Sequence, residues 1–159
     1  MTERAQQLHA AADRQITALI DLASALDQDM LRRPCSGREK LGDGTVGASA
    51  QHTADNYQRI AAFVETSDRM SAGDEPRDHD GHRGQYTADS VDLAGLVAQL
   101  ATTRTALRHI AELRDDQLEE IPPAGSLRFC DGQRTLEQVL TSLLTHQAHQ
   151  LDALGAATA

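Results

Sequence analysis

The chain has 159 residues, with 24 acidic and 15 basic side chains and a formal net charge of −9. A chain of this length can bury a sizeable core as one unit, so we expect a single domain over residues 1–159. The negative charge argues against a surface that neutralises phosphates, and the chain has only two Tyr and two Phe and no Trp with which to stack bases. Nucleic acid is therefore not an expected partner.

The sequence also argues against a membrane partner. No apolar stretch reaches the roughly 18 residues that a membrane span needs, and the first residues lack the apolar segment of a signal peptide. We therefore expect a cytoplasmic protein. Cys35 and Cys130 do not form a CxxC pair and are too few for a disulfide framework, so both are expected as thiols.

Apolar residues recur at three- and four-residue spacing in four stretches, which predict helices over about 3–31, 45–68, 89–115 and 135–156. The segments between them contain every proline and nearly all glycines, as connections do. The fourth helix opens at Thr135 with the capping-box sequence TLEQ. Period-two alternation is absent, so the sequence predicts an all-α fold, a four-helix bundle.

The connection over 69–88 is much longer than the two to eight residues, roughly, that usually join neighbouring helices of a bundle. It is long enough to run the full length of the helices. We therefore expect an up-down-down-up bundle with a crossover between the second and third helices. The alternative is an up-down-up-down bundle in which residues 69–88 form a disordered loop at one end.

Helical geometry predicts which polar residues face the interior. The inward face of the fourth helix is defined by its leucines, Leu136, Leu140, Leu143, Leu151 and Leu154. Gln150 lies about 40° and His146 about 80° from Leu136, whereas His149 lies about 140° away and should face solvent. In the second helix, His52 lies about three full turns before Phe63 and shares its side of the buried stripe. In the crossover topology His52, His146 and Gln150 would share one shallow pocket.

Two segments, TVGASAQHTADNYQRIAAFV and TLEQVLTSLLTHQAHQLDAL, resemble matching parts of the DinB-like (damage-inducible) family of four-helix-bundle proteins. That family is related to mycothiol-dependent maleylpyruvate isomerase-like proteins and to bacillithiol or mycothiol transferases. The resemblance extends to helix number, the long second connection and chain length. It implies a divalent metal, zinc or nickel, held by one His of the second helix and two His spaced H-x3-H on the fourth.

By position, the resemblance places metal ligands at His52 and His146 and a third at Gln150, where the family has His. A neutral carboxamide oxygen is a weaker zinc ligand than imidazole. Three alternatives remain open: Gln150 binds weakly through its oxygen, His149 replaces it after a local twist, or the site has become a hydrogen-bonded pair.

The resemblance implies an S-transferase or isomerase in which the metal activates the sulfur of a low-molecular-weight thiol, mycothiol or bacillithiol, toward an electrophile. The alternative function is a non-enzymatic, metal-free bundle that acts as a binding or stress-response protein, with a homodimer formed through a helix face.

We interpret Cys35, in RPCSGREK, as an inert half-buried thiol near the His52 end of the bundle. His79 and His82 are interpreted as part of a mobile acidic loop.

Overall fold

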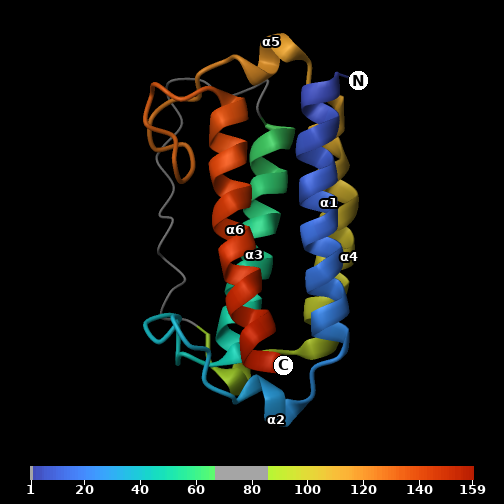
Figure 1. Cartoon of the computed structure of the whole chain (residues 1–159), viewed down its shortest axis with the longest axis vertical. Coiled ribbons are helices and arrows are strands. Elements are labelled where there is room, and N and C mark those ends of the chain that lie inside the picture. The colour runs from blue at the N-terminus through green and yellow to red at the C-terminus, as the bar shows by residue number, and fades with distance from the viewer. Residues whose placement is uncertain (1, 67–85) are drawn as a thin grey trace.

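The computed structural model describes residues 2–66 and 86–159, and its long helices pack side by side as a bundle (Figure 1). These helices are α1 (Glu3–Ser24), α3 (Val46–Glu65), α4 (Leu93–Ala106) and α6 (Leu136–Thr158). Among the shorter elements, α2 (Gln28–Leu31), α5 (Asp115–Leu118) and the 3-10 helix η2 (Ala88–Ser90) lie at the ends of the bundle, whereas the 3-10 helix η3 (Leu107–Glu112) continues α4 and packs against α1. The described residues contain no strand, which confirms the all-α prediction. None of their helices is both long and apolar enough to cross a bilayer.

Side-chain caps fix where the long helices begin. Thr2, Thr45 and Asp92 each accept a hydrogen bond from the backbone amide three residues further on, which satisfies one of the unpaired amides of the first turn. At the start of α6 the predicted capping box is present. Gln138 N donates to Thr135 Oγ1 at 3.2 Å, and Thr135 N donates to Gln138 Oε1 at 3.0 Å.

Two of the predicted helices are interrupted. The first was expected over 3–31, but α1 ends at Ser24 and Asp27 then caps α2 by accepting a hydrogen bond from Met30 N at 2.8 Å. The third was expected over 89–115, but α4 begins at Leu93 and is followed by the 3-10 helix η3 from Leu107. Apolar spacing continues through both interruptions because the short elements bury their side chains in the same core. The spacing alone therefore did not mark the breaks.

The other two long helices differ from their expected bounds only at the ends. The second was expected over 45–68, and α3 ends at Glu65 with Thr66 as its C-cap. The fourth was expected over 135–156, and α6 continues to Thr158.

Contacts between helices set their relative directions, which Figure 1 also shows. Thr53 of α3 contacts Gln150 of α6, and three residues further along α3 Asn56 contacts Gln147, so these two helices are antiparallel. Between α3 and the α4–η3 unit, by contrast, residue numbers rise together, from the Gln51–Gln99 pair to the Glu65–His109 pair. These helices run in the same direction. The connection that joins them, within which the crossover was expected, lies mostly outside the described residues.

Tyr57 joins three helices at the centre of the core. It is fully buried among the leucines and isoleucines of α1, α3 and α6. Its hydroxyl donates to Gln15 Oε1 at 2.8 Å, and Gln15 Nε2 donates to the Leu144 carbonyl at 3.1 Å. Burial raises the pKa of Tyr57 well above its ordinary value, so the phenol stays neutral. This chain of contacts links α3 to α1 and α1 to α6.

The facing sides of α3 and α6 carry most of the buried polar side chains among the described residues. These are Ser49, His52, Thr53, Gln147 and Gln150. Polar side chains are normally kept out of the core of a bundle unless they find hydrogen-bond partners or serve a function. The candidate site lies along this polar face.

Candidate functional site

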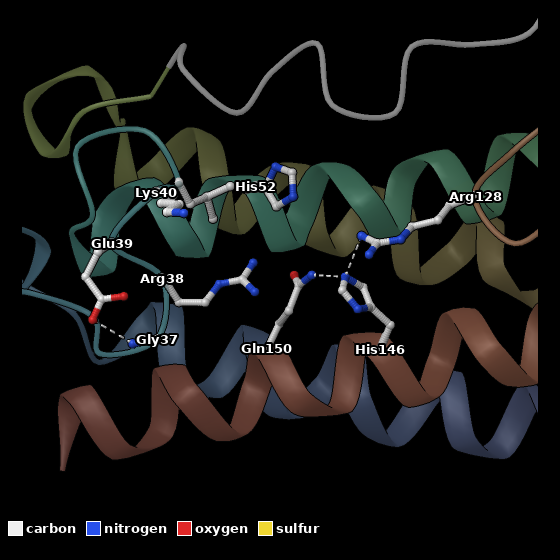
Figure 2. A pocket seen from close by; sticks show the side chains of 9 residues that line it. Gly37, Arg38, Glu39, Lys40, His52, Arg128, His146 and Gln150 are labelled. Carbon is white, nitrogen blue, oxygen red and sulfur yellow. Dashed lines mark hydrogen bonds between the residues drawn. The ribbon is translucent and has the colours of Figure 1, made fainter.

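A cavity of about 350 Å³ opens between α3, α6 and two connecting loops (Figure 2). His52, His146 and Gln150 all line it, so the structure brings together the three residues that helical geometry placed in one pocket. His52 is 5% exposed and Gln150 only 1% exposed. His149 is exposed and does not line the cavity.

The loop after α2 forms one wall of the cavity. Its ends are closed by Cys35 N, which donates to the Gly44 carbonyl at 2.8 Å, and by an antiparallel bridge between Pro34 and Thr45. The side chain of Cys35 is fully buried and that of Leu41 nearly so. These two buried residues anchor the loop, and the segment between them, residues 37–41, lines the cavity with Arg38 and Lys40.

A glycine holds this loop against the start of the next described segment. Gly42 has a φ of +56°, and a Cβ there would lie 2.2 Å from the carbonyl oxygen of Tyr86, so no other residue fits without displacing the backbone. Asp43 N donates to the same carbonyl at 3.1 Å. The Tyr86 hydroxyl donates to Asp55 of α3, and burial together with this carboxylate raises the pKa of Tyr86 to about 12. The loop that carries Arg38 and Lys40 is thus tied to α3 through Tyr86.

The connection between α5 and α6 holds Arg128 between two buried residues, as the loop after α2 holds Arg38 and Lys40. Leu127 and Cys130 are buried, Cys130 N donates to the Leu127 carbonyl at 3.0 Å, and Arg128 lies between these anchors. The next residue, Phe129, has a φ of +70°, a left-handed conformation that costs a non-glycine residue roughly 1–2 kcal/mol. In this conformation its ring lies under the Arg128 guanidinium, 5.3 Å from ring centre to Cζ, and edge-on to the His146 ring at 6.2 Å.

His146 is the centre of the polar contacts in the cavity. Its Nε2 lies 3.1 Å from Arg128 Nη1 and 2.6 Å from Gln150 Nε2 (Figure 2). A guanidinium nitrogen can only donate, so the Nε2 of His146 accepts and carries no proton. The Nε2 of Gln150 also faces it, while the Gln150 oxygen lies 3.0 Å from Thr53 Oγ1, whose single proton is shared with the Ser49 carbonyl at 2.7 Å. The lone pair of His146 is therefore shared between two N–H donors.

The cavity is positively charged within an acidic chain. Among the described residues that line it are Arg38, Lys40 and Arg128, against a single carboxylate, Glu39. Glu39 Oε1 accepts from Gly37 N at 3.0 Å, and its own backbone amide and that of Gly37 lower the pKa of the carboxyl. In Figure 2 this carboxylate turns to the far end of the loop, away from His52 and His146.

As placed, these residues do not fit a divalent metal. Within residues 2–66 and 86–159, no group of three or more His, Cys, Asp or Glu side chains could hold a metal ion, although the expected set of two His and one Gln is not of that kind. Of the expected ligands, His146 already directs its Nε2 at Arg128, and Gln150 presents its NH₂ group, which has no lone pair to offer a metal. The nearby cations oppose a divalent ion further.

The cysteines act as anchors in this structure. Cys35 was expected to be half-buried, but it is fully buried, with its Sγ 3.9 Å from the Ala153 carbonyl. Burial raises the pKa of both the Cys35 and Cys130 thiols, which disfavours the reactive thiolate. Neither forms a disulfide. His79 and His82 lie outside the described residues.

The basic side chains are the part of the site that helical periodicity did not predict. Arg38, Lys40 and Arg128 come from loops, where no regular spacing indicates direction. One local pattern is shared, since in both RPCSGREKL and SLRFC buried Cys and Leu residues bracket the basic ones. Comparison of the chain with protein-family models, with curated proteins and with solved structures gives no match.

Proposed function

We propose that the chain is a metal-free helical bundle that binds a small molecule in the cavity around His52, His146 and Gln150. The observation that carries this proposal is the environment of His146, whose Nε2 accepts from both Arg128 Nη1 and Gln150 Nε2. The binding-protein function, rather than the metalloenzyme, agrees best with this geometry.

Electrostatics support the same conclusion. A zinc ion bound to His146 would lie about 2.0–2.1 Å from Nε2 and would compete for the lone pair that now faces the two N–H donors. Such an ion would lie within about 5 Å of the Arg128 guanidinium, where the repulsion is roughly 7 kcal/mol at an effective dielectric constant of about 20. Coordination would require Arg128 to leave His146 and Gln150 to turn its amide around.

The second candidate is the metal- and thiol-dependent transferase or isomerase that the DinB-like resemblance implies. It is favoured by the shared location of His52, His146 and Gln150 in one cavity. The parallel course of α3 and α4 further supports the crossover that the length of the connection over 69–88 predicts, and the DinB-like resemblance shares this long connection. In this candidate His52 and His146 would hold zinc or nickel, which would lower the pKa of a bound thiol such as mycothiol or bacillithiol.

A zinc and nickel titration separates the two candidates. Protein purified without chelators and without a His-tag should contain only traces of metal, because no described set of donors is arranged for it. Calorimetric titration at pH 7.5 should give the same weak isotherm for the wild type, for His146→Ala and for the exposed control His149→Ala. Stoichiometric zinc or nickel that is lost in His146→Ala but kept in His149→Ala would overturn the proposal and favour the metalloenzyme.

A further inference from the structure

We infer that the cavity binds a small oxyanion, a carboxylate or a phosphate group, through Arg38, Lys40 and Arg128. This inference rests on the proposed function and specifies the chemical class of the ligand. It follows from the charge of the cavity, from the way its cations are held and from its size.

Lys40 and Arg128 line the cavity without an ion pair to a carboxylate among the described residues, whereas several arginines elsewhere have one. Five arginines form ion pairs with nearby carboxylates: Arg4 with Glu137, Arg32 with Asp89, Arg104 with Asp13, Arg114 with Asp116 and Arg134 with Asp131. Among the described residues, neither Lys40 nor Arg128 forms such a pair, and the same is true of Arg14, Arg33, Arg59 and Arg108. Lys40 and Arg128 differ from these four because both line one cavity, and two such cations on one cavity of a chain with 24 acidic residues favour an anionic ligand.

Arg128 is held in place before any ligand arrives. Its guanidinium stacks on Phe129 and donates one N–H to His146, so its orientation is fixed by two contacts. A guanidinium has five N–H donors, which leaves others for a carboxylate or phosphate oxygen. The strained backbone of Phe129 is what places the ring there, and strain of this kind is characteristic of ligand-binding positions.

The two arginines reach the cavity from different walls. In Figure 2 Arg38 extends from the loop after α2 and Arg128 from the loop before α6, and Gln150 and His146 lie between them. Opposed guanidinium groups of this kind can hold one oxyanion between them or the two ends of a dianion. A cavity of about 350 Å³ lies at the lower end of the range for small-molecule sites, roughly 300–1,000 Å³. The ligand is therefore a small metabolite-sized anion.

Titration with inorganic phosphate and, separately, with malonate tests this inference. Binding is followed by ¹H–¹⁵N spectra at pH 7.5, with ionic strength held constant by NaCl. The amides of residues 37–41 should shift saturably with at least one probe. Arg128→Gln should weaken that binding at least about tenfold, because it removes a charge-assisted hydrogen bond donor. Tighter binding of phosphate identifies a phosphorylated ligand, and tighter binding of malonate identifies a carboxylate.

Arg134→Gln is the matched control. It removes the same charge from the same loop, and Arg134 also lies over Phe129, but it does not line the cavity. Its anion affinity should equal that of the wild type. Arg38→Gln provides a second variant if circular dichroism shows that Arg128→Gln is unfolded.

Two outcomes would overturn the inference: no saturable shift with either anion, or an equal loss of affinity in Arg134→Gln. Zinc added to the same samples separates this failure from that of the proposed function. If neither zinc nor either anion binds, the anion inference alone is overturned. Stoichiometric zinc binding lost in His146→Ala overturns the metal-free function itself.

Discussion

A Gln150→His variant should bind zinc at least about tenfold more tightly than the wild type, a gain of about 1.4 kcal/mol. Residue 150 lies one turn beyond His146 on α6, and both line the cavity with His52. The substitution removes the amide that now donates to His146 and supplies a third imidazole in its place. Calorimetric titration measures the gain, and the thermal unfolding midpoint should rise only when zinc is added.

Two further variants sharpen this test. His149→Ala should leave zinc affinity unchanged, since this side chain is exposed and lies outside the cavity. Adding Arg128→Gln to Gln150→His should raise zinc affinity further, because the guanidinium no longer opposes the ion. If zinc affinity instead falls in His149→Ala and does not rise in Gln150→His, the side of α6 assigned to the cavity is wrong.

Tyr57→Ala should lower the free energy of unfolding by about 3–5 kcal/mol, the usual cost of truncating a buried aromatic residue. The side chain is fully buried where α1, α3 and α6 meet, so its removal leaves a cavity that the helices cannot easily close. Tyr57→Phe should cost only about 0.5–1.5 kcal/mol, because it removes just the hydrogen bond to Gln15. Urea denaturation followed by circular dichroism measures both values.

Ile121→Ala serves as the matched control for the Tyr57 series. Ile121 is a large apolar side chain that is 54% exposed, so its truncation should change the free energy of unfolding by no more than about 0.5 kcal/mol. A Tyr57→Ala cost similar to that of Ile121→Ala would show that Tyr57 does not lie in the core.

The helix-borne part of the candidate site could be predicted because helices are regular. A turn of about 100° per residue was enough to separate Gln150 and His146 from His149 on α6. The apolar stripe of α3 likewise placed His52 at the edge of the core. These inferences need only the residues within each helix and the antiparallel pairing of α3 with α6.

The loop-borne part could not be predicted, because the path of a loop depends on contacts far away in sequence. Arg38 reaches the cavity because Cys35 is buried and because Gly42 packs on the backbone of Tyr86. Arg128 reaches it because Phe129 takes a left-handed conformation that sequence rules reserve mainly for glycine. Periodicity carries no signal for any of these contacts.

The helix breaks were missed for a related reason. Asp27 is a good N-cap, but the apolar spacing on either side of it is that of one continuous helix. A capping residue inside an apolar repeat is therefore a signal that could have divided the predicted first helix.

The nitrogen resonances of the His146 imidazole distinguish hydrogen bonding at Nε2 from metal coordination. Long-range ¹H–¹⁵N spectra at pH 7.5, assigned with a His146→Gln variant, report which ring nitrogen carries the proton. We expect an unprotonated Nε2 that accepts hydrogen bonds, a protonated Nδ1, and no change in either resonance with one equivalent of zinc. If one equivalent of zinc instead changes the His146 Nε2 resonance together with the His52 ring resonances, these residues form a metal site and the cavity is not metal-free.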